Sequence, residues 1–273
     1  MCKMKKCILS VLVFAFVVSV FAEEIKFLPD GSVYFGEMKD GIFEGHGTQV
    51  FQNGAKYTGE FSKGLYNGHG KYESLLYNYD GDFSNGLCHG HGIYEALLYT
   101  YDGNFVDGMM EGQGVMKYHD GTVYKGSFKN CEPDGKGRVT FFDGSYYEGN
   151  FKEGLKDGLG LWSFADGSSY SGEFKQNYYD GEGVFQDADG IKYKGHWTKG
   201  ALNGNGLIIY PNGRKKKVVF EKTAIKGGKN KKPFPFVEVL SLILFALVIL
   251  LLINNIRLKK RLQSFEQAKD NSL

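Results

Sequence analysis

A single repeat pattern governs the middle of this chain. Tyrosines recur every 22 or 23 residues, at Tyr34, Tyr57, Tyr79, Tyr101, Tyr124, Tyr147, Tyr170 and Tyr193. Counting from each tyrosine, positions +2, +11 and +13 are glycine in all eight repeats. Position +4 is aromatic in seven repeats and is Met38 in the first. A fixed period of this length indicates an array of similar structural units stacked along one axis.

The repeats also account for the unusual glycine content. Of 39 glycines in 273 residues, all but Gly227 and Gly228 occupy repeat positions. Collagen and disordered low-complexity chains are also rich in glycine. Here, however, there are only 5 prolines, and aromatic residues make up 15% of the chain. Four cysteines are too few for a disulfide scaffold. The glycines therefore mark backbone positions in a repeated fold.

Each repeat has the pattern of a β-hairpin. The Tyr and Phe of Tyr-x-Gly-x-Phe lie four residues apart, so they share one face of a strand. Glycine at +7 in six repeats marks a chain reversal. An Asp-Gly or Asn-Gly pair at +19/+20, as in Asn53-Gly54, is the strongest short-range hairpin signal. We expect the +11 and +13 glycines to make room for aromatic rings. Glycine recurs too often for a helix, so the pattern predicts one continuous antiparallel sheet.

The pattern Tyr-x-Gly-x-Phe/Trp-x-x-Gly-x-x-x-Gly-x-Gly resembles the MORN (membrane occupation and recognition nexus) repeat over about residues 27–213. This resemblance implies an all-β fold: an elongated single-layer array of antiparallel β-hairpins, twisted and grooved. Family members mostly serve as membrane-associated scaffolds or tethers, and some are proposed to bind phosphoinositides. Cys131 and Asn177 replace the +7 glycine, and repeats two and three have altered tails, Glu73–Tyr77 and Glu95–Tyr99.

The site residues predicted from the sequence are the ones that define the repeat. Their expected role is structural. They are Tyr34, Gly36, Tyr57, Gly59, Phe61, Tyr79, Gly81, Phe83, Tyr101, Gly103, Phe105, Tyr124, Gly126, Phe128, Tyr147, Gly149, Phe151, Tyr170, Gly172, Phe174, Tyr193, Gly195 and Trp197.

Two apolar segments flank the array. Residues 1–22 have three lysines followed by an apolar run and small residues before Glu23, which is typical of a signal peptide; an uncleaved N-terminal anchor is the alternative. Residues 234–253 are long and apolar enough for one C-terminal transmembrane α-helix. We therefore divide the chain into 1–22, the array 23–213, a basic linker 214–233, the helix 234–253 and a charged tail 254–273.

Charge is segregated along the chain. Residues 23–213 carry 16 basic and 27 acidic side chains, whereas residues 214–232 carry nine basic side chains and one acid. An acidic array disfavours nucleic-acid binding, which needs clustered lysine and arginine. The linker lies beside the predicted membrane helix, so its lysines are candidates for contact with anionic headgroups. These are Lys215, Lys216, Lys217, Lys229, Lys231 and Lys232.

Catalytic and metal-binding constellations are not expected. Gly-x-Gly recurs as a strand element without the helix and Lys-Ser/Thr of a phosphate loop. His46, His69 and His91 share position +12 of consecutive repeats. Equivalent strands lie about 9.5 Å apart, which is too far for shared coordination at about 2 Å. We predict no enzyme activity, no cofactor and no metal.

The sequence thus favours a non-enzymatic, membrane-anchored scaffold or tether. The signal peptide would place the array on the non-cytoplasmic side (periplasmic, luminal or extracellular), with an unidentified protein partner and homo-oligomers formed through the end strands. The alternative is a phospholipid-binding tether with a cytoplasmic array and a C-terminal tail anchor, an arrangement that resembles junctophilin-type proteins.

Overall fold

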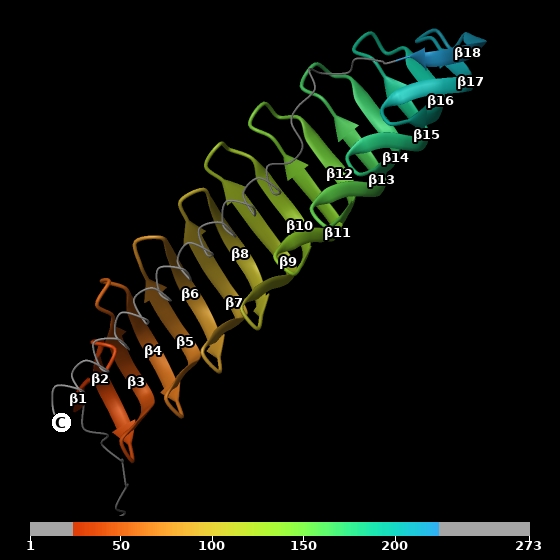
Figure 1. Cartoon of the computed structure of the whole chain (residues 1–273). Helices are drawn as coiled ribbons and strands as arrows, with labels where there is room; N and C mark the ends of the chain where they lie inside the picture. Colours follow the sequence, from red (N-terminus) through yellow and green to blue (C-terminus); the bar gives the residue numbers. More distant parts are fainter. Residues whose placement is uncertain (1–23, 224–273) are drawn as a thin grey trace, which may run out of the picture.

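The computed structural model describes residues 24–223, which form one antiparallel sheet of 18 strands (Figure 1). Each strand pairs with the next in sequence, from β1 with β2 to β17 with β18. The strands are β1 (Glu24–Phe27), β2 (Val33–Lys39), β3 (Ile42–Val50), β4 (Lys56–Ser62), β5 (Leu65–Glu73), β6 (Tyr77–Ser84), β7 (Leu87–Ala96), β8 (Tyr99–Val106), β9 (Met109–Tyr118), β10 (Val123–Lys129), β11 (Glu132–Thr140), β12 (Tyr146–Lys152), β13 (Leu155–Ser163), β14 (Ser169–Lys175), β15 (Tyr178–Gln186), β16 (Lys192–Thr198), β17 (Ala201–Ile209) and β18 (Lys215–Thr223). The predicted all-β hairpin array is therefore confirmed.

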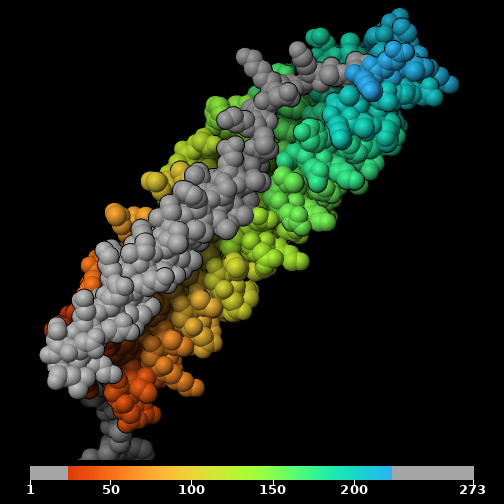
Figure 2. All heavy atoms as spheres, viewed as in Figure 1, coloured from red at the N-terminus to blue at the C-terminus, as the bar shows by residue number. Residues whose placement is uncertain are grey.

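The sheet is an elongated body in which chain order follows position in space. Figure 2 shows the colours running from red to blue along its long axis. Because strands pair only with their sequence neighbours among residues 24–223, each repeat holds a fixed place along this axis. The array can thus present different side chains at different distances from its ends.

One boundary predicted from the sequence is too early. Lys215–Thr223 form β18, although this segment was assigned to the basic linker 214–233. β18 begins a ninth, truncated repeat, in which Phe220 is buried at the position of the +4 aromatic residue. The strand is hard to predict from the sequence because three consecutive lysines, 215–217, are typical of a charged linker. Within the described residues, the sheet therefore extends to Thr223.

A continuous row of glycines crosses the sheet. One glycine on each strand from β2 to β16 pairs in register with a glycine on the next strand. The row consists of the +2 and +13 positions of every repeat. It ends where Gly206 pairs with Val218 and Gly36 pairs with Glu24. The repeat period thus places all these glycines side by side.

The tyrosine of each of the first seven repeats lies over this row. A Cβ atom added to Gly126 would come within 2.5 Å of Gly137 Cα and 2.6 Å of Tyr124 Oη. Tyr124 Oη donates a hydrogen bond to the carbonyl of Ser127 at 2.9 Å. The same bond to the +3 carbonyl forms at Tyr34, Tyr57, Tyr79, Tyr101, Tyr147 and Tyr170. Only glycine lets the ring approach the backbone this closely.

Aromatic rings continue this packing from repeat to repeat. The Tyr57 ring meets Phe61 of its own repeat and Phe83 of the next, both at 5.1 Å between centroids and nearly perpendicular. Edge-to-face geometry of this kind is favourable for aromatic rings. All eight +4 side chains, Met38 included, are buried. A line of interlocked rings along one face therefore forms the centre of the core.

The glycine at +11 has a role that we did not predict. Its φ angle lies between 63° and 111° in all eight repeats, and the strand register shifts next to it. Such glycines form β-bulges. The +13 glycine makes room for a ring, as expected, but the +11 glycine instead bends the strand.

The two edges of the array carry different turns. The tightest turn lies at +6/+7, where Asp40 and Gly41 have φ values of 53° and 74°. Cys131 and Asn177 adopt the same left-handed conformation, at 66° and 71°. At the opposite edge, the Asp/Asn-Gly pairs lie in longer loops, in which Asn53 Oδ1 accepts a hydrogen bond from the Ala55 N–H. The strongest hairpin signal in the sequence therefore does not mark the shortest turn.

No helix among residues 24–223 is long and apolar enough to cross a membrane. The predicted signal peptide 1–22 and transmembrane segment 234–253 lie outside the described residues.

The glycine row leads to a matched pair of predictions. We expect Gly126→Ala to lower the free energy of unfolding by about 3 kcal/mol, because the new methyl group would meet backbone atoms and a buried ring. Gly195→Ala, at the same +2 position, should cost about 1 kcal/mol or less. Its nearest atom would be the end of the Leu202 side chain, at 3.0 Å. Urea denaturation measures both values, and equal losses would contradict the proposed crowding.

Candidate interaction surface

The residues that define the repeat are buried and structural. The tyrosines at 34, 57, 79, 101, 124, 147 and 170 have no exposed surface, and their aromatic partners at +4 are nearly as buried. Burial raises the pKa of the Tyr34 hydroxyl to about 12, with a further contribution from Glu37. These side chains are thus unable to contact a partner directly.

The eighth repeat departs from this arrangement. Tyr193 is only partly buried, and its hydroxyl donates to Asp187 Oδ2 at 3.2 Å. Leu202 and Phe220 lie against Gly195 and Gly206 instead. Gly206 pairs with Val218 on the next strand, so the row of paired glycines ends at this repeat. Tyr193 and Gly195 therefore belong to the end of the array.

A buried lysine stands out in the sixth repeat, and sequence reasoning missed it. Lys156 on β13 is 1% exposed. Its Nζ lies 4.0 Å from the centroid of the Trp162 ring and 5.6 Å from that of Tyr147. Within the described residues it has no ion pair. Burial lowers the pKa of this amine to about 7. Lys156 stands at position +9 of its repeat, and this position is aromatic or aliphatic in several other repeats. That pattern was the sequence feature that could have predicted its burial.

Lys156 predicts a specific pH dependence. Its folded-state pKa is depressed, so the unfolded chain binds the extra proton between about pH 7 and pH 10.5, and stability rises with pH across that window. We expect the stability gained by Lys156→Met to be largest and constant below pH 7. It should shrink towards pH 10, by at most about 5 kcal/mol. Urea denaturation of both proteins from pH 6 to 10 measures this difference. A difference that does not change with pH would contradict the account.

The opposite, outer face carries exposed polar side chains. His69 Nε2 lies 3.3 Å from Asp80, and His91 Nε2 lies 3.1 Å from Asp102. In the part of the chain that the structure describes, no group of three or more such side chains could hold a metal ion. In the +12 row, His69 and His91 therefore contact separate carboxylates.

Consecutive hairpins are tied together at the tight-turn edge. The side chain at +10 accepts a hydrogen bond from a backbone N–H in the next hairpin's turn, as Glu44 does from Lys63 at 2.8 Å and Glu111 from Asn130 at 2.9 Å. Asp134, Asp157, Asp180 and Asn203 make equivalent bonds. These contacts fix each turn relative to its neighbour.

The altered tails of repeats two and three form the most apolar exposed surface of the opposite edge. Leu75 and Leu76 join β5 to β6, and Leu97 and Leu98 join β7 to β8. Their side chains are 97%, 61%, 81% and 43% exposed. We call these two segments the di-leucine loops. They replace the Asp/Asn-Gly loops of the other repeats. The sequence Leu-Leu-Tyr in both tails could have indicated these apolar loops.

A ladder of tyrosines supports the di-leucine loops from below. Tyr77 stacks on Tyr72 at 5.3 Å and on Tyr94 at 5.2 Å, and Tyr94 stacks on Tyr99 at 5.9 Å. Ser74 Oγ also donates to the Tyr77 carbonyl at 2.7 Å. Because the tyrosines occupy the inward positions, the leucines next to them project outward. The exposure of the leucines is thus built into the loops.

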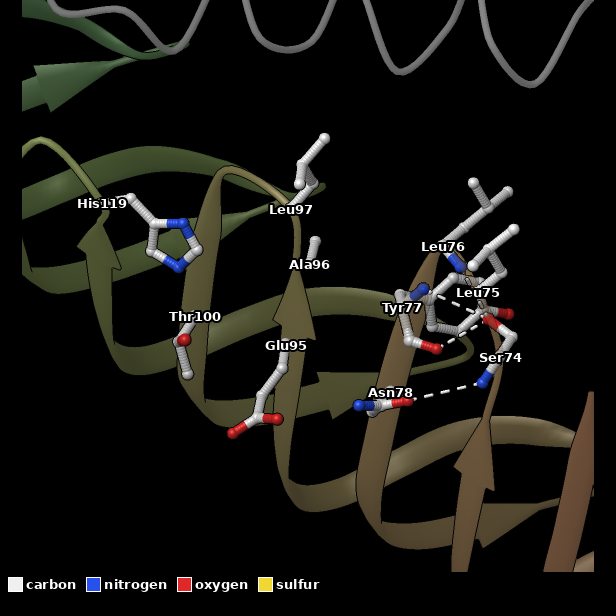
Figure 3. Close-up of a pocket in the computed structure, with 10 residues that line it drawn as sticks. All are labelled: Ser74, Leu75, Leu76, Tyr77, Asn78, Glu95, Ala96, Leu97, Thr100 and His119. Carbon is white, nitrogen blue, oxygen red and sulfur yellow. Dashed lines mark hydrogen bonds between the residues drawn. The ribbon is translucent and has the colours of Figure 1, made fainter.

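A shallow hollow of about 420 Å³ lies between the two loops (Figure 3). It is lined by Ser74, Leu75, Leu76, Tyr77, Asn78, Glu95, Ala96, Leu97, Thr100 and His119. In Figure 3 the leucines extend from the loops, while Asn78 and Glu95 lie on the strands beneath them. Exposed apolar side chains that lie close together are typical of a protein-interaction site.

The lysines predicted to meet headgroups are only partly located. Lys215, Lys216 and Lys217 are exposed on β18, the last strand of the sheet. Lys229, Lys231 and Lys232 lie outside the described residues. The basic surface is therefore at one end of the array, and the di-leucine loops are in repeats two and three, towards the other.

The strand order and the pairing of each strand with the next define an elongated β-repeat protein. The family model for the MORN repeat matches residues 34–56, 57–74, 79–95, 101–123, 124–146, 147–169, 170–192 and 193–213. These matches cover more than half of the chain, so the protein belongs to the MORN repeat family. The predicted eight repeats are confirmed. No curated protein matches the chain.

Similarity to solved structures is distant. The TCP10 domain of Danio rerio CPAP, as an E1021V mutant, is 16% identical, with 76% of this chain and 99% of that chain covered and a TM-score of 0.41. The Drosophila melanogaster SAS-4 TCP domain, solved with a proline-rich motif of Ana2, is 12% identical, with 80% and 98% covered and a TM-score of 0.32. These scores are too low to transfer any function.

Proposed function

We propose that this protein is a non-enzymatic scaffold or tether that holds a protein partner at its di-leucine loops. The observation that carries the proposal is the set of four exposed leucines on two adjacent loops; two of them, Leu75 and Leu97, are the most exposed large hydrophobic side chains of residues 24–223. Contiguous exposed apolar side chains of this kind mark interaction sites. The array fixes where along its length the partner is held.

A set of leucine substitutions tests this proposal. We expect Leu75, Leu76, Leu97 and Leu98 changed together to Ser to abolish partner capture in cells without unfolding the sheet, because these side chains contribute little to its core. Cross-linking followed by mass spectrometry measures capture, and circular dichroism measures folding.

The opposite edge offers a matched control. Ile42, Leu65 and Leu87 are 50%, 47% and 49% exposed beside the tight turns. Changing these three to Ser should leave capture intact. The proposal fails if both sets have the same effect, or if the di-leucine set has none.

We further propose that residues 234–253 anchor the protein in a membrane and that the array lies on the non-cytoplasmic side. Two features support this: the length and apolar character of 234–253, and the basic and apolar pattern of residues 1–22. An anchored array would hold a partner bound at the di-leucine loops away from that membrane.

Sidedness is tested best with a new cysteine. Burial raises the pKa of the Cys88 thiol to about 11 and also raises that of Cys131, so both native thiols react poorly. Ala165 lies in an exposed loop. We expect Ala165→Cys to be labelled in intact cells by an impermeant maleimide. Labelling only after permeabilisation would contradict a non-cytoplasmic array and favour the tail-anchored alternative.

The lipid-binding tether remains the second candidate function. The exposed lysines 215–217 on β18 favour it, because basic side chains near a membrane attract anionic lipids. The acidic excess of residues 23–213 opposes lipid contact along the rest of the array. We therefore assign any headgroup contact to β18 and to the lysines that follow it. The same lysines oppose pairing of β18 with the edge strand of another copy. The formation of homo-oligomers is therefore still a prediction from the sequence.

A further inference from the structure

We infer that the hollow between the di-leucine loops binds a short protein segment in which apolar side chains flank a lysine or arginine. This inference rests on the proposed scaffold function and specifies the chemistry of the partner.

The apolar part of the specificity comes from the rim. Leu75 and Leu97 are the most exposed of the four leucines and stand on opposite sides of the hollow. Burying leucine side chains against a partner is favourable because it removes apolar surface from water. The rim therefore selects apolar side chains on both sides of the contact.

The preference for a lysine or arginine comes from the polar residues at the bottom of the hollow. Glu95 is exposed, and within residues 24–223 its carboxylate has no hydrogen bond or ion pair, only a longer-range electrostatic interaction with Lys71. Its partners in register are Asn78 and Thr100, which are both neutral. The neighbouring Glu73, in contrast, accepts from Lys56 at 2.8 Å and Lys71 at 2.9 Å. Hydrogen bonds from Lys56 and Lys71 lower the pKa of Glu73 to about 2. Glu95 is thus the carboxylate left available in the hollow.

The surroundings reinforce this preference for a cation. The hollow is lined by no lysine or arginine, and residues 23–213 carry an excess of acidic side chains. A field of one sign around a shallow site attracts ligands of the opposite sign and repels like charge. An anionic membrane surface would meet this carboxylate unfavourably, which favours a protein segment over a lipid headgroup.

Peptide selection tests the inference. The full chain in lipid nanodiscs is panned against a random heptapeptide phage library, with counter-selection on empty nanodiscs and on the variant with all four leucines changed to Ser. We expect enriched peptides to carry a lysine or arginine within two positions of an apolar residue. Glu95→Gln should remove the charge preference, and Glu95→Lys should reverse it towards acidic peptides. Glu148→Lys, an exposed acid on the outer face, should leave the selection unchanged.

Three outcomes would overturn the inference. The first is enrichment of apolar peptides with no charge preference. The second is a preference that Glu95→Lys does not change. The third is leucine-dependent binding of phosphatidylcholine vesicles in place of peptides. In each case, loss of partner capture in the four-leucine Ser variant would still support the scaffold function, so the two proposals fail separately.

Discussion

The close approach of a tyrosine ring to a pair of glycines is the constraint on which this structure depends. Each ring of the first seven repeats lies flat against two adjacent strands where side chains are absent, and its hydroxyl satisfies a carbonyl of the same strand. The position of the ring therefore depends both on the two glycines and on the hydrogen bond of its hydroxyl. Since the glycines pair in register on every strand from β2 to β17, one local rule yields a sheet with no interruption.

This rule separates shape from recognition. Residues that build the array are buried along one line, so substitutions there affect folding first. Sequence variation is tolerated in the loops at the two edges of the sheet, because a chain reversal requires only that its residues can adopt the backbone conformation of the turn. The two altered tails use this freedom: Tyr77 and Tyr99 extend the stack of rings, and the leucines beside them face outward. Within a repetitive frame, such irregular units are natural places for partner contact.

The sequence was sufficient to predict the hairpins, their number and their buried rings, because these depend on periodicity alone. It was not sufficient for features that depend on register between strands. The glycine row could not be predicted because +2 and +13 become neighbours only after the +11 bulge shifts the strand. The sequence predicts a linker where β18 lies because the lysines of this segment are typical of a linker, and Phe220 is the single aromatic residue that indicates a further repeat. Lys156 was missed because burial at its position depends on rings from neighbouring strands.

A loop transplant tests most directly the claim that the repeats set the shape and the two tails provide the contact. The tails of repeats two and three would be exchanged with Phe141–Ser145 and Phe164–Ser168 of repeats five and six. Partner contact would then be mapped by photocross-linkers placed in both pairs of loops. The account predicts that the sheet stays folded and that cross-linking moves with the leucines. Cross-linking that stays at repeats two and three would contradict it.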